Sequence, residues 1–150
     1  MNEAVVWGAF VLAALSGLPG LLGAWRWYRL EASRAFWILL RVAQVAALVY
    51  ALAIGVLAVA GHYSSEHLFY LYALLPLAIG FVAEQLRVAS AQTILDQHDL
   101  ADARAVGELP EGEQQAIVAA IVRREMGVMT LSAWVVVFLA LRAAETAHGF

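Results

Sequence analysis

Four long, mainly apolar segments separated by short polar ones set the pattern along this chain. They cover approximately residues 4–25, 35–60, 67–95 and 113–144. The last has a shorter uncharged core, residues 126–140, which helix-forming sequence extends on both sides. A bilayer has a hydrocarbon core roughly 30 Å thick, which about 20 helical residues cross. The segment cores are apolar on every face, unlike the alternating strands of a membrane barrel. The pattern therefore predicts an all-α integral membrane protein, a bundle of four transmembrane helices.

The composition supports this class. Hydrophobic residues make up 63% of the chain and charged residues 14%, against roughly 45–50% and about 25% in ordinary soluble domains. No linker-like tract divides the 150 residues, so we expect a single four-span domain. Cysteine is absent, which excludes disulfides, thiolate metal sites and thiol nucleophiles. The formal net charge of -3 comes without a basic surface, which argues against a nucleic-acid partner.

Arginine is concentrated around two of the three connections between the segments. Four arginines surround the first connection and four the third: Arg26, Arg29, Arg34 and Arg41, then Arg87, Arg104, Arg123 and Arg124. The second connection, residues 61–66, has none, and only Arg142 lies towards the opposite end. Basic residues are retained on the cytoplasmic side during insertion. We therefore expect an N-out, C-out topology with the first and third connections in the cytoplasm.

The residue usage also suggests a location. All nine basic residues are arginine, and the chain is rich in alanine. This bias is typical of GC-rich bacterial genomes, so we expect a multi-pass protein of the bacterial cytoplasmic (inner) membrane. The first segment is preceded only by Met1-Asn2-Glu3, which lacks the basic residues of a signal peptide. It is therefore expected to remain as a span.

The third and fourth helices are expected to continue beyond the bilayer as an antiparallel cytoplasmic hairpin. After Glu84, apolar and polar residues alternate at helical spacing for several more turns, and residues 113–125 repeat the pattern. The connection between them, residues 96–112, is acidic and should be solvated. Within it, residues 99–106 could form a short helix, and Pro110 suits the first position of the last helix.

Polar and charged residues from three helices project to a single level near the inner ends of the spans. They are Arg41, Gln44, Glu84, Gln85, Arg87, Arg123, Arg124 and Glu125. A charge that faces lipid costs about 2.5–3.5 kcal/mol at mid-helix and less near the interface, so these groups should face one another or water. They form either a boundary layer of arginines with counter-ions, or a buried network around Arg41 and Glu84 that binds a polar ligand, proton or ion.

Three of the four histidines are expected at the outer end of the bundle. They are His62, His67 and His148. With the nearby Glu66 and Glu145 they form a candidate set for zinc or copper, and two of them could ligate a haem iron. Tyr70 and its aromatic neighbours could form the floor of a quinone pocket. Polar outer loops are also places where histidine needs no ligand, so both interpretations stay open.

Small residues form stripes along the first two helices. They are Ala9, Ala13, Gly17 and Gly20 in the first helix, and Ala43, Ala47, Ala51 and Gly55 in the second. Such stripes let helix backbones approach closely in a membrane. They predict specific packing of these two helices, although frequent alanine would also produce stripes by chance.

The sequence leaves three classes of function open. No hydrolase, P-loop, HExxH or CxxC pattern is present, which favours a non-catalytic subunit that self-associates or docks onto a larger membrane complex. The first alternative is a redox protein that holds haem, quinone or a metal at the outer histidines. The second is a small oligomeric transporter or channel that uses the inner arginine and glutamate cluster. The lipid bilayer is an expected partner in each case.

Overall fold

The computed structural model describes all 150 residues and is entirely helical, without strands. The helices are α1 (Asn2–Arg29), α2 (Arg34–Val59), α3 (His67–Gln97), α4 (Ala103–Gly107) and α5 (Glu111–Thr146). All except the short α4 are long and apolar enough to cross a membrane. The predicted all-α class with four membrane-length helices is therefore confirmed, and the length and composition of these helices indicate a multi-pass membrane protein.

Local sequence explains where several helices begin and end. The hydroxyl of Ser33 accepts a hydrogen bond from the Phe36 N–H at 3.2 Å and so caps the start of α2. Leu30, in the left-handed conformation with φ 56°, ends α1. Pro110, expected at the first helical position of α5, is instead the N-cap residue directly before Glu111. The acids in the first turn of α5 complement the positive end of its dipole.

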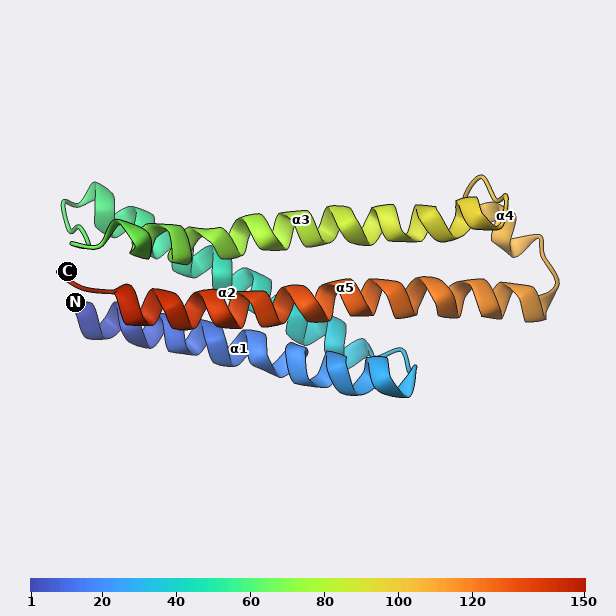
Figure 1. Cartoon of the computed structure of the whole chain (residues 1–150), viewed down its shortest axis with the longest axis horizontal. Coiled ribbons are helices and arrows are strands. Elements are labelled where there is room, and N and C mark those ends of the chain that lie inside the picture. The colour runs from blue at the N-terminus through green and yellow to red at the C-terminus, as the bar shows by residue number, and fades with distance from the viewer.

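Helix α5 is the centre of the bundle. It lies along both α1 and α3, with which it makes the two most extensive contacts, whereas α2 packs mainly on α1 and more thinly on α3 (Figure 1). The N-terminus, the C-terminus and the connection between α2 and α3 lie together at one end of the molecule. There the Phe150 N–H donates to the Asn2 side-chain oxygen at 2.7 Å. At the other end, α3 and α5 continue past the ends of α1 and α2.

Glycines let α1 and α5 approach closely. A Cβ on Gly20 would lie 3.2 Å from the Trp134 ring, and one on Gly127 would lie 3.2 Å from the Trp27 ring. Gly23 is tighter still, because its Cβ would lie 2.3 Å from the Thr130 hydroxyl. Small residues of α1 therefore pack closely against α5 as well as against α2, where a Cβ on Gly8 would lie 3.0 Å from the Tyr50 ring.

The small-residue stripes are only partly buried. Ala9 and Ala13 on α1 and Ala43, Ala47 and Ala51 on α2 are buried. By contrast, Gly55 is exposed, and a Cβ there would meet nothing within 4 Å. Contact between α1 and α2 does occur, and the Tyr50 hydroxyl of α2 donates to the Val5 carbonyl of α1 at 3.3 Å.

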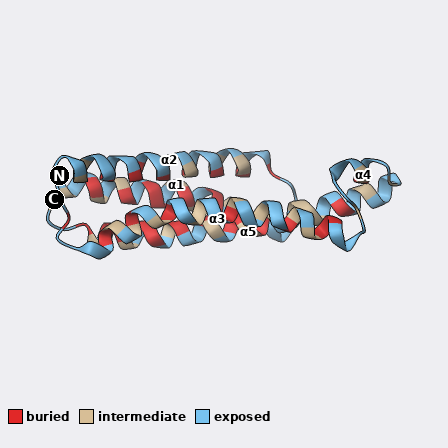
Figure 2. Cartoon of the chain, turned by 90° about the horizontal axis from the view of Figure 1, so that it is seen from above, coloured by how far each residue is buried: buried red, intermediate tan, exposed pale blue.

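The outer face of the bundle is apolar. Buried residues follow the facing sides of the helices, and half of the residues of α2 are exposed (Figure 2). Its exposed side chains include Val45, Leu52, Val56 and Val59. Such a surface would be an association hazard in water, whereas lipid covers it in a bilayer.

Candidate functional site

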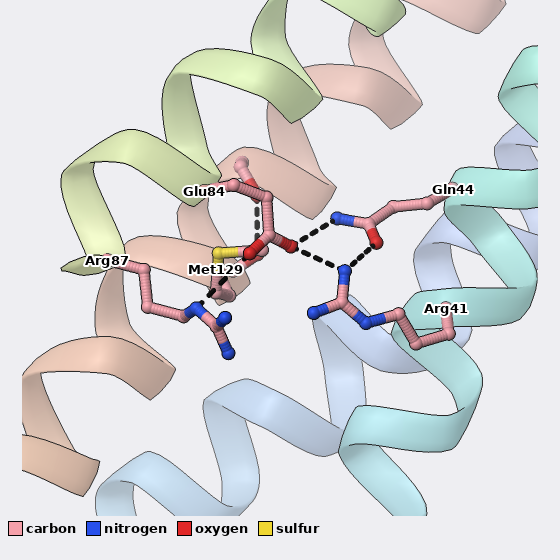
Figure 3. Close-up of polar contacts among 6 residues, drawn as sticks. Arg41, Gln44, Glu84, Arg87 and Met129 are labelled. Carbon is pink, nitrogen blue, oxygen red and sulfur yellow. Dashed lines mark hydrogen bonds and ion pairs between the residues drawn. The ribbon is translucent and has the colours of Figure 1, made fainter.

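The densest group of polar contacts lies between α2 and α3, centred on Glu84. The Arg41 Nη1 donates to Glu84 Oε1 at 2.6 Å and to the Gln44 side-chain oxygen at 2.6 Å. The Gln44 amide donates to the same Glu84 oxygen at 3.0 Å. The Arg87 Nε lies 3.2 Å from Glu84 Oε2, an ion pair without hydrogen-bond alignment (Figure 3). We call Arg41, Gln44, Glu84 and Arg87 the polar cluster.

Helical spacing places these four side chains together. Arg41 and Gln44 are three residues apart on α2, as are Glu84 and Arg87 on α3, so each pair shares a helix face. One turn before Arg41, the Trp37 ring lies under the Arg87 guanidinium, 5.4 Å from its centre. This cation–π contact adds a second link between the helices. The polar cluster therefore joins α2 to α3, where apolar contact is thin.

The polar cluster is only partly exposed and carries a net charge. The exposed fractions of the side chains are 26% for Glu84, 28% for Arg87 and 51% for Arg41. The four residues together carry a net charge of +1, and the carboxylate of Glu125 on α5 lies within electrostatic range of Arg87 without contacting it. Each guanidinium has five N–H groups, and Glu84 and Gln44 occupy only a few of them. Donors and positive charge thus remain for an anionic group.

An apolar cavity of about 280 Å³ adjoins the polar cluster. We call it the α2–α3 groove. Its walls come from α2 and α3, and α5 forms the floor. Its small lining residues are Ala43, Ala47, Gly80 and Ala133. Gln44 and Glu84 line it as well, which places the cluster at its edge. Ser132 is the remaining polar lining residue, and its hydroxyl donates to the Met129 carbonyl at 2.8 Å.

The other residues predicted for the inner network make no direct contact with the polar cluster, although Glu125 lies close enough for its charge to interact with Arg87 and Glu84. Arg123, Arg124 and Glu125 on α5 make no side-chain hydrogen bond or ion pair, and neither does Gln85 on α3. Arg123 lines a separate cavity of about 540 Å³ beside the connection between α1 and α2. The structure thus brings four of the predicted residues together. It also adds Trp37, which lies one turn from Arg41.

The histidines predicted at the outer end do not form a metal-binding group. His62, His67 and His148 are all exposed, and no group of three or more His, Asp or Glu side chains is arranged to hold a metal ion. Glu66 is exposed as well, and Glu145 pairs with Arg142. The predicted metal set of these residues is therefore not assembled: His62 lies beyond the end of α2 and His148 beyond the end of α5, and both side chains are exposed.

The end of the bundle that carries both termini is held by contacts of the backbone instead. The carbonyl of His148, rather than its imidazole, accepts hydrogen bonds from the Ser65 N–H and the Ser64 hydroxyl, each at 2.9 Å. The Tyr70 hydroxyl accepts from the Ser64 N–H at 2.9 Å. Tyr70, predicted as part of a quinone pocket, thus fixes the connection between α2 and α3, and its ring packs edge-on against Phe69.

Comparison with known proteins found no matching family model, no matching curated protein and no matching solved structure.

Proposed function

We propose that this chain is a non-catalytic subunit of a larger assembly in the bacterial cytoplasmic membrane, and that it docks through its cytoplasmic hairpin. The hairpin comprises residues 88–97 of α3, α4, and residues 111–122 of α5. The observation that carries this proposal is that α3 and α5 extend past α1 and α2 (Figure 1). Crossing a bilayer does not require this extension, and it has a small core of its own, formed by Ile94, Leu95, Val106 and Ile117.

The surface of the hairpin supports a docking role. Ten residues of α3 beyond Arg87 add about 15 Å at the helical rise of about 1.5 Å per residue. Lipid tails do not reach the far part of this extension. Val88, the first residue of the hairpin after Arg87, is 62% exposed, and Val118 on α5 is 51% exposed. Val118 also lines the cavity of about 540 Å³ beside the connection between α1 and α2. Apolar side chains outside the membrane are suited to contact with another protein subunit.

The proposed orientation is N-out and C-out, and reporter fusions test it. A periplasm-active reporter inserted at Gly61 should be active, because that connection has no arginine to retain it. The same reporter inserted at Asp99 should be inactive, while a cytoplasm-active reporter there should work. Activity at Asp99 together with inactivity at Gly61 would reverse the orientation and place the hairpin outside the cell.

A measurement of native mass tests the docking role. Tagged chain extracted from its own membranes in mild detergent is expected to run well above its 16.2 kDa monomer, with partner chains at fixed stoichiometry. Val88→Asp and Val118→Asp should reduce it to the monomer, because a charge placed in an apolar interface is costly to desolvate.

Val59→Asp is the matched control for this experiment. It makes the same change at an exposed valine, but at the end of α2 far from the hairpin. The complex should survive this substitution. A monomeric wild-type chain, or equal loss of the complex in all three variants, would contradict hairpin docking.

A small oligomeric transporter is the second candidate, and the polar cluster would be part of its pathway. The distribution of polar side chains weighs against it. Beyond Gln44 and Glu84, the α2–α3 groove is lined by apolar residues such as Ala47, Leu77 and Val136. A transport pathway would need polar side chains across the full depth of the membrane-spanning bundle. The redox alternative would need His62, His67 and His148 to form a metal-binding group. They form none, so the subunit proposal is favoured over this alternative as well.

A further inference from the structure

We propose that the α2–α3 groove binds one anionic phospholipid, with an acyl chain along the groove and the phosphate at Arg41 and Arg87. This inference concerns a ligand and does not depend on the partner of the hairpin. Placing the lipid in the cytoplasmic leaflet does rest on the orientation proposed above. The choice of an anionic headgroup rests only on the charges of the polar cluster.

The order of residues along the two helices matches the order of parts in a phospholipid. Helices α2 and α3 run in opposite directions, so Arg41 precedes Gln44 on one while Arg87 follows Glu84 on the other. Both arginines therefore lie on the hairpin side of the polar cluster, and the apolar groove begins on the other side, at Gln44 and Glu84. A headgroup held by the arginines would leave its chain pointing into the groove.

The size of the groove favours a chain over a protein helix. Its volume is about 280 Å³, whereas an α-helix with side chains is roughly 10–12 Å across. The walls at Ala43, Ala47 and Gly80 are formed by small residues, and nothing lies within 4 Å of a Cβ built on Gly80. A narrow, unbranched hydrocarbon fits such a space.

The charge of the polar cluster selects the headgroup. The two guanidinium groups share the single carboxylate of Glu84, and Glu125, whose charge acts on Arg87, contacts neither of them, so both arginines keep free N–H donors. A phosphodiester carries −1 and accepts hydrogen bonds from guanidinium N–H groups. A zwitterionic lipid brings an ammonium group to the same place, where the remaining positive charge repels it. Basic residues at this level of a membrane protein attract anionic lipids.

Native mass spectrometry of the full chain, with phosphatidylglycerol or phosphatidylcholine added at equal concentration, tests this proposal. The wild-type chain is expected to retain one phosphatidylglycerol with a preference of about fivefold, the effect of one net basic charge near a membrane surface. Arg41→Gln combined with Arg87→Gln should abolish the preference for phosphatidylglycerol. Arg34→Gln, at an exposed arginine at the start of α2 that makes no ion pair, should leave it unchanged.

A second variant tests the groove without touching the charges. Gly80→Leu fills the groove and has room to do so, so the fold should persist while retention of phosphatidylglycerol is lost. Gly55→Leu is its control, because Gly55 has the same open surroundings on α2 outside the groove. Equal retention of both lipids by the wild type, or unchanged retention in Gly80→Leu, would overturn the proposal.

Discussion

Replacing Gly23 with alanine is expected to lower the free energy of unfolding by about 1–2 kcal/mol, although alanine is the better helix former. The added Cβ would lie 2.3 Å from the Thr130 hydroxyl and 2.5 Å from Cε2 of Phe36. Phe36 is fully buried and cannot give way easily. The gain in helix propensity, about 0.8–1 kcal/mol, is therefore outweighed by overpacking between α1, α2 and α5. Unfolding in detergent, followed by circular dichroism, measures the difference.

The matched control for this substitution is Gly55→Ala. Gly55 also lies within a helix, but nothing surrounds its Cβ position, so alanine there should raise the free energy of unfolding by up to about 1 kcal/mol. The two alanine variants are thus expected to differ in sign. A stabilised Gly23→Ala variant would mean that α1 and α5 pack less closely than the structure has them.

Glu84→Gln is expected to have the second large effect, a loss of about 1–3 kcal/mol. Removing one partner of a buried ion pair costs about 3–5 kcal/mol, whereas exposed pairs contribute about 0–1 kcal/mol. The partial exposure of Glu84 and Arg41 places the polar cluster between these limits. The substitution keeps the size of the side chain but leaves Arg41 and Arg87 without their shared carboxylate. Unfolding in detergent again provides the measurement.

Glu145→Gln is the control for this loss, because Glu145 forms an exposed ion pair with Arg142 near the C-terminal end of α5, away from the polar cluster. Its expected cost is below about 1 kcal/mol. Combining Glu84→Gln with Arg41→Leu should give a non-additive result, with a coupling of at least about 0.5 kcal/mol. Additive losses would mean that these residues form a boundary layer of independent charges and not a network.

The bounds of the helices could be predicted from the sequence because the bilayer restricts them so strongly. The largest differences are at the end of α1, predicted near residue 25 and found at Arg29, and at the start of α4, predicted at residue 99 and found at Ala103. The helix contacts were harder to predict. Ala9, Ala13 and Gly20 suggested packing against α2, yet the most extensive contact of α1 is with α5. A stripe of small residues shows that a face can approach another helix without showing which helix it meets.

The candidate site, like the helix contacts, could be predicted from the sequence only in part. Sequence spacing gives the depth of each polar residue along its helix, and depth alone brought Arg41, Gln44, Glu84 and Arg87 to one level. Arg123 and Arg124 share that depth but extend from α5 in other directions. The rotation of a helix about its own axis depends on tertiary packing, which the spacing does not encode. The position of Trp37, one turn from Arg41, was the one local signal that could have extended the prediction.

The central position of α5 has a consequence for biosynthesis. A ribosome delivers α1 and α2 to the membrane first, yet the helix against which α1 packs most extensively is synthesised last. Until then the glycine-lined face of α1 must remain in contact with lipid, and the bundle closes only after insertion is complete. Truncation before α5 would therefore leave an N-terminal helix pair that inserts normally but lacks its partner, a natural substrate for membrane quality-control proteases.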